Sequence, residues 1–181
     1  MEGKAWLHFK TITKHKVIVM KYCFQVGLYK QGLLHDLSKY YPIEFKVGAK
    51  YYLGNESPNN AERREKGYSS SWLHHKGRNK HHYEYWIDYS LEPGKILEGT
   101  KMPLCYVVEM FLDRVAASKV YYGKDFNTRI PLEYYQHSCS HMIIHPETQK
   151  LLEQLLMMFY KKGEKKTLYY IKHVLLPKKK Y

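Results

Sequence analysis

The fold is decided around residues 32–39, which read Gly32-Leu33-Leu34-His35-Asp36-Leu37-Ser38-Lys39. The two leucines place the adjacent imidazole and carboxylate at the start of an expected buried helix. Polar groups in an apolar setting need partners, and a metal ion satisfies both types of group at once. Neighbouring side chains on a helix diverge by about 100°. A metal ion here therefore needs donors from other segments, or Asp36 has to bridge two ions.

Composition predicts a single soluble domain with an anionic partner. The chain has 181 residues and a net charge of +13, which favours nucleotides, nucleic acid or other polyanions. We expect one helical domain over residues 1–176 and a basic tail over 177–181. The three cysteines form no Cys-x-x-Cys pair, so we expect no disulfide framework and a cytoplasmic location. No stretch reaches 18 apolar residues, so we expect no membrane contact.

Helical periodicity runs through most of the chain and predicts an all-α bundle. The expected helices cover residues 4–27 (with a break near Thr13), 33–39, 43–52, 72–76, 103–122, 131–140, 146–162 and 164–176. Residues 54–67 are rich in helix breakers and predict a surface loop or lid with one helical turn, and residues 90–101 predict a loop. No strand alternation or hairpin turn is visible. The leucine stripe over residues 151–159 belongs either to the core or to a dimer face.

Two of these helices carry a single polar donor on an apolar face. His15 heads a stripe that continues with Ile18, Val19, Tyr22 and Val26. Asp113 lies in the middle of the apolar face of helix 103–122, one turn after Glu109. Both are candidate metal ligands. The alternatives are a hydrogen-bonded core or surface histidine for His15 and a buried salt bridge for Asp113. Glu109 is expected to be a structural or solvated acid, with the orientation of a metal ligand as its alternative role.

Two histidine pairs lie between these helices, at 74–75 and 81–82. We expect two of the four imidazoles to be metal ligands and favour His75 and His82. His74 and His81 would then face a phosphate or solvent. Imidazole and carboxylate donors without thiolates suit Mn²⁺, Fe²⁺, Zn²⁺, Co²⁺ or Ni²⁺, as one ion or as two.

This arrangement resembles the HD-domain superfamily of metal-dependent phosphohydrolases. That superfamily combines an upstream histidine, an adjacent His-Asp pair, often further histidines and a late aspartate. The matching residues here are His15, His35, Asp36 and Asp113, and Lys39 completes a His-Asp-x-x-Lys string. The resemblance implies an HD-domain-like helical bundle with a metal-activated water.

The chain also resembles, more closely, an uncharacterised family of small bacterial and phage-type proteins that is sometimes labelled "catalase". Residues 35–40, 72–86 and 107–120 carry this likeness. It transfers no activity, and nothing in the sequence suggests a haem site.

The expected function is hydrolysis of a nucleotide or another small phosphorylated metabolite. The first ion would be held by His15, His35, Asp36 and Asp113, and the second by His75 and His82 with Asp36 bridging. We expect Asp36 and Lys39 to be catalytic. The expected phosphate contacts are Lys39, Arg78, Lys80, His81 and Arg114, with Tyr83, Tyr85 or Trp86 stacking on a base. The alternatives are a di-iron oxygenase on the same scaffold and a non-enzymatic protein that binds nucleic acid.

Overall fold

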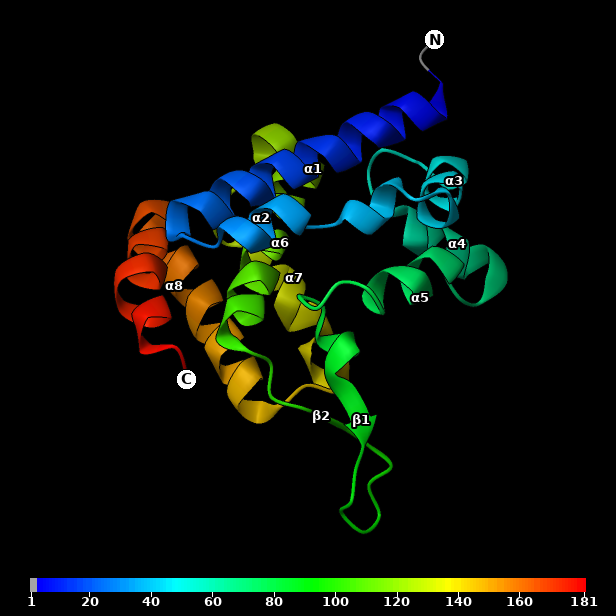
Figure 1. Cartoon of the computed structure of the whole chain (residues 1–181). Helices are drawn as coiled ribbons and strands as arrows, with labels where there is room; N and C mark the ends of the chain where they lie inside the picture. Colours follow the sequence, from blue (N-terminus) through cyan, green and yellow to red (C-terminus); the bar gives the residue numbers. More distant parts are fainter. Residues whose placement is uncertain (1–2) are drawn as a thin grey trace.

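The computed structural model describes residues 3–181, and this part of the chain is all-α apart from one small hairpin (Figure 1). The sequence-based prediction of an all-α fold is therefore confirmed. The elements are α1 (Lys4–Val26), α2 (Tyr29–Leu34), α3 (Pro42–Lys50), α4 (Pro58–Lys66), α5 (Ser70–Lys76), β1 (Ile87–Tyr89), β2 (Leu97–Gly99), α6 (Leu104–Tyr122), α7 (Ile130–Ser138) and α8 (Pro146–Tyr170).

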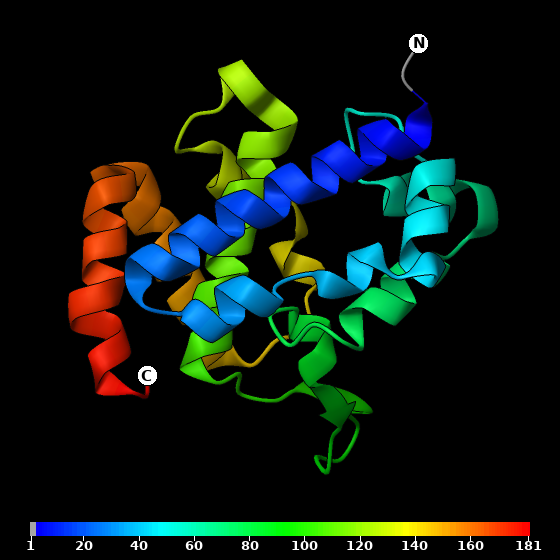
Figure 2. The same cartoon turned by 45° about the horizontal axis from the view of Figure 1, so that its top comes forward.

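Helix α6 is the centre of the molecule, and α1, α2, α7 and α8 contact it. Most of its apolar side chains are buried and form the core with residues of α1 and α8. Phe111 of α6 meets Phe159 of α8 edge to face, with ring centroids 5.9 Å apart. Figures 1 and 2 show α1 crossing α6, while α3, α4 and α5 gather beside the N-terminal half of α1. Within residues 3–181, no helix combines the length and hydrophobicity of a membrane span.

The C-terminal part of the chain follows the predicted boundaries closely. Gly163 has φ 77° and ψ 173° and divides α8 into two helical stretches, at the position where the sequence predicts one helix to end and the next to begin. The last residue of the chain, Tyr181, packs on the bundle. The Tyr181 hydroxyl donates to the Met102 carbonyl at 2.6 Å and lies 2.7 Å from Thr148 Oγ1, so it docks the C-terminus on the bundle.

Outside the His35-Asp36 region, three local predictions were wrong. Helix α1 passes through Thr13 without a break. Helix α4 occupies much of the predicted 54–67 loop, because its buried Glu62 accepts hydrogen bonds from Ser69 and Ser70, both at 2.7 Å. The segment after Trp86 contains the antiparallel β1–β2 hairpin. Its strands have three residues each, too few to show an alternating pattern.

Candidate metal centre

The His35-Asp36 pair lies in a sharp joint and not inside a helix as the sequence suggested. Helix α2 ends at Leu34, and a 3₁₀ turn begins at Leu37. Between them Asp36 adopts a left-handed conformation with φ 54° and ψ 23°, which is rare for residues other than glycine, asparagine and aspartate. The joint turns the side chains of His35 and Asp36 toward the same buried space, and each of these residues is 2% exposed.

The first donor set brings His15 from α1 and Asp113 from α6 to this joint. His15 Nε2 lies 2.9 Å from Asp113 Oδ1 and 3.5 Å from Asp36 Oδ2. His35 Nε2 lies 3.4 Å from each of the same two oxygens. One donor atom from each of the four residues falls within 4.8 Å of all the others.

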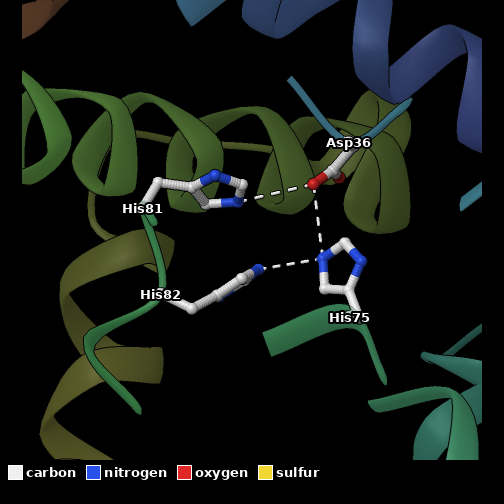
Figure 3. Close-up of side chains that lie close together, drawn as sticks. All are labelled: Asp36, His75, His81 and His82. Carbon is white, nitrogen blue, oxygen red and sulfur yellow. Dashed lines mark hydrogen bonds and ion pairs between the residues drawn. The ribbon is translucent and has the colours of Figure 1, made fainter. Parts of the chain in front are cut away.

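The second donor set uses the other oxygen of Asp36. His75 Nε2 lies 3.3 Å from Asp36 Oδ1, and His81 Nε2 lies 3.4 Å from it. His82 Nε2 lies 3.0 Å from His75 Nε2, so the three rings and the carboxylate converge (Figure 3). Their donor atoms also lie within 4.8 Å of one another. Asp36 is thus common to both sets, with one oxygen directed to each.

Two further carboxylates contact the Nδ1 atoms of the histidine rings and so fix the orientation of the rings. Glu109 Oε1 lies 2.9 Å from His35 Nδ1 and 3.2 Å from His81 Nδ1, and Glu44 Oε2 lies 2.9 Å from His75 Nδ1. Burial opposes ionisation of Glu109, but hydrogen bonds from the two histidines lower its pKa below the usual value. An ionised carboxylate only accepts, so each Nδ1 carries a proton. With Nδ1 held in this way, Nε2 is the nitrogen that each of these three rings presents to the shared centre, as in metal-ligating histidines.

Buried atoms of the centre have unused hydrogen-bonding capacity. Asp36 Oδ1 and His81 Nε2 are buried and have no hydrogen-bond partner among residues 3–181. Burial disfavours charge on both Asp36 and His35. Even so, the positive charge of His35 and Lys39 holds the pKa of Asp36 well below its usual range, and Asp36 and Asp113 raise the pKa of His35 well above its own. Asp36 is therefore ionised in its buried position, as a metal ligand has to be. The donor set fits one divalent ion on each side of Asp36.

A cavity of about 530 Å³ opens onto this centre. That volume lies in the range of ligand-binding pockets. His15, His75, His82 and Asp113 face it, and so do Lys39 and Arg114. Lys39 Nζ lies 2.6 Å from Asp36 Oδ2, and the carboxylates of Asp36 and Asp113 raise the pKa of Lys39 although burial opposes its charge. No carboxylate in residues 3–181 forms an ion pair with Arg114, whose Nε is buried without a hydrogen-bond partner. The cavity therefore offers an anion two cations beside the donor sets.

The structure brings together all six residues predicted as metal ligands, but it separates the predicted phosphate contacts. Lys39 and Arg114 line the cavity. Arg78 and Lys80 are exposed and do not line it, because the buried Asn79 between them anchors the turn inward by donating to Ser38 Oγ and to the His75 carbonyl, both at 2.8 Å.

His81 is not placed to contact a phosphate. Its ring is 2% exposed and lies between Asp36 and Glu109, where it belongs to the second donor set. His74 makes a 2.5 Å contact with Glu44 Oε1 and stays outside both sets.

The sequence analysis did not predict the residues that orient the metal-ligand candidates, which are Glu109, Glu44 and Asn79. Glu109 precedes Asp113 by one helical turn on α6, and this spacing was the available signal for a shared face. Glu44 and Asn79 gave no comparable signal, since a single acid on a short helix and a single amide in a turn are usually solvated.

Comparison with known proteins places the chain in a family but transfers no activity to it. No curated protein and no solved structure matches it significantly. Residues 4–158, which include both donor sets and the elements that hold them, match a family of unknown function, DUF5662. The chain belongs to DUF5662.

Proposed function

We propose that the protein is a metal-dependent phosphohydrolase or phosphodiesterase of HD type, with two divalent ions bridged by Asp36. Its substrate would be a nucleotide or another small phosphorylated metabolite. The observation that carries the proposal is the division of Asp36 between two donor sets, Oδ2 toward His15 and His35 and Oδ1 toward His75 and His81. The order of donors along the chain, from His15 to Asp113, supports assignment to the HD type.

Two such ions, when bound, lower the pKa of a water and polarise a phosphate oxygen. The chain supplies the remaining functions. Lys39 and Arg114 neutralise phosphate oxygens from the cavity side, with Arg114 free of any competing carboxylate among residues 3–181. Tyr83 also lines the cavity and offers a ring face to the organic part of the substrate. Asp36 would be the ligand shared by the two ions.

The direct test is hydrolysis of phosphate esters by protein purified without chelators. p-Nitrophenyl phosphate, bis-p-nitrophenyl phosphate and nucleoside monophosphates would be assayed with Mn²⁺, Fe²⁺, Co²⁺, Ni²⁺ and Zn²⁺. Arg114→Ala should lower kcat/KM about 10- to 100-fold, the effect of losing a charged hydrogen bond. Arg78→Ala is the matched control, since Arg78 is an exposed arginine outside the cavity, and it should change kcat/KM less than twofold.

The same experiment separates the competing functions. Iron content with oxygen consumption and no ester hydrolysis would identify a di-iron oxygenase and overturn the hydrolase proposal. Binding to RNA or DNA that weakens steeply with salt and survives Asp36→Asn would identify a nucleic-acid-binding protein.

A further inference from the structure

His8 is a cavity-lining histidine that belongs to neither donor set. His8, Thr11 and His15 lie on one face of α1 and all line the cavity. Seven residues of α-helix separate His8 from His15, which corresponds to roughly 10 Å along the axis. The cavity therefore extends from the metal centre along two turns of α1, as far as His8.

The ring of His8 is held in place by packing. It is 6% exposed and packs against Phe45 and Tyr52, with ring centroids 5.4 and 5.9 Å away. Gly48 of α3 makes room for it, because a Cβ at that position would lie 2.3 Å from His8 Nε2. Among residues 3–181, His8 Nδ1 has no hydrogen-bond partner. A buried polar group without a partner is costly, so the site favours a ligand that supplies one.

His8 is neutral near pH 7. Burial and the positive charge of Lys39 lower its pKa to about 4. A neutral imidazole offers one N–H donor and one lone pair, so it recognises a polar uncharged group and does not add to the phosphate-binding charge. Beside it, the hydroxyls of Thr11 and Tyr52 lie 2.8 Å apart and also line the cavity.

We propose that His8 is a specificity-determining residue, which hydrogen-bonds a polar group in the organic part of the substrate about two helical turns from the bound phosphate. The inference rests on the proposed function and narrows the substrate class. It selects phosphate esters whose organic part is as long as a nucleoside and ends in a hydrogen-bonding group. A site of this kind discriminates strongly against ligands that leave its polar group unpaired.

The test compares long and short phosphate compounds on metal-loaded protein. Affinities for AMP, GMP, CMP, UMP and inorganic phosphate would be measured by calorimetry, and kcat/KM for the nucleotides and for p-nitrophenyl phosphate. His8→Phe keeps a ring between Phe45 and Tyr52 but removes both nitrogens. It should weaken binding of the preferred nucleotide about tenfold and raise its KM, while affinity for phosphate, turnover of p-nitrophenyl phosphate and metal content change less than twofold.

Two further variants complete the design. His8→Gln restores a hydrogen-bonding group and should recover part of the nucleotide affinity. His137→Phe removes an exposed histidine outside the cavity and should have no effect. Equal losses for nucleotide and phosphate in His8→Phe, no loss for either, or no nucleotide binding by the wild type would overturn the inference. Absence of ester hydrolysis with nucleotide binding intact would instead overturn the proposed function.

Discussion

The two donor sets reach the same carboxylate by different routes. The first gathers His15 from α1 and Asp113 from α6 at the joint between α2 and the following 3₁₀ turn, so its residues are far apart in sequence and lie on elements of the core. The second takes His75, His81 and His82 from one short segment. The first set is therefore fixed by the packing of the bundle. The second is fixed by a local turn and by the carboxylates behind its rings.

The sets also differ in chemistry. The first offers two imidazoles and two carboxylates, and the second offers three imidazoles and the shared carboxylate. Oxygen donors favour harder cations such as Mn²⁺, and imidazole suits Zn²⁺, Fe²⁺, Co²⁺ and Ni²⁺. We therefore expect the two positions to differ in affinity and in metal preference.

Asp36→Asn should have the largest effect on the metal centre. Asparagine tolerates the left-handed backbone of the joint, so the fold should persist while the shared negative charge is lost. Metal content should fall from about two ions per chain to below one, and ester hydrolysis about 10³-fold or more. Elemental analysis and circular dichroism would measure both consequences. Full metal content in a folded variant would contradict the shared-carboxylate arrangement.

A substitution that affects only one of the two donor sets should remove only the ion of that set. Asp113→Asn replaces a carboxylate of the first set by a neutral amide, and His82→Ala removes a nitrogen donor from the second. Each variant should retain about one ion per chain, and the ion that remains should differ in metal preference as the donor chemistry dictates. Competition between Mn²⁺ and Zn²⁺ on the two variants measures this. Identical preferences would show that the sets are not independent positions.

Replacing Glu109 or Glu44, the carboxylates that orient the histidine rings, by glutamine should weaken metal binding without abolishing it. Glu109 contacts a histidine of each set, whereas Glu44 contacts only His75 of the second set. Loss of such an anchor costs about 10- to 100-fold in metal affinity. Glu109→Gln should therefore weaken both ions, and Glu44→Gln only the ion of the second set. Equal effects of the two variants on both ions would contradict the geometry.

His8 lies outside both sets, and its substitution should leave metal content unchanged while altering the pH dependence of stability. Its pKa of about 4 is below the value of 6.5 in an unfolded chain, so only the unfolded state binds this proton at intermediate pH. Stability is therefore lost as the pH falls from 6.5 toward 4, by about 2 kcal/mol at pH 5.

His8→Phe should remove this part of the acid sensitivity. Urea unfolding of the wild type and the variant at pH 7 and pH 5 would measure the difference. Parallel losses of stability in the two proteins would show that His8 does not titrate as described.

Periodicity predicted most of the fold and the buried faces that carry His15 and Asp113, whereas the resemblance to the HD-domain superfamily supplied their combination with His35, Asp36, His75 and His82. The apolar stripe that follows His15 and the apolar face around Asp113 identify the buried faces of α1 and α6. These two faces pack together because both have to be removed from water. The left-handed turn at Asp36 could not be predicted, since it is fixed by packing on both sides of the joint. The inward direction of His81 and the outward direction of Arg78 and Lys80 depend on the hydrogen bonds of Asn79, which no sequence pattern reveals.

The central claim is that one carboxylate holds two metal ions. A crystal structure of protein loaded with Mn²⁺ or Zn²⁺, recorded at the absorption edge of the metal, tests it most directly. We expect two anomalous peaks about 3.5–4 Å apart, one beside each oxygen of Asp36. A single peak, or peaks that do not contact Asp36, would contradict the account.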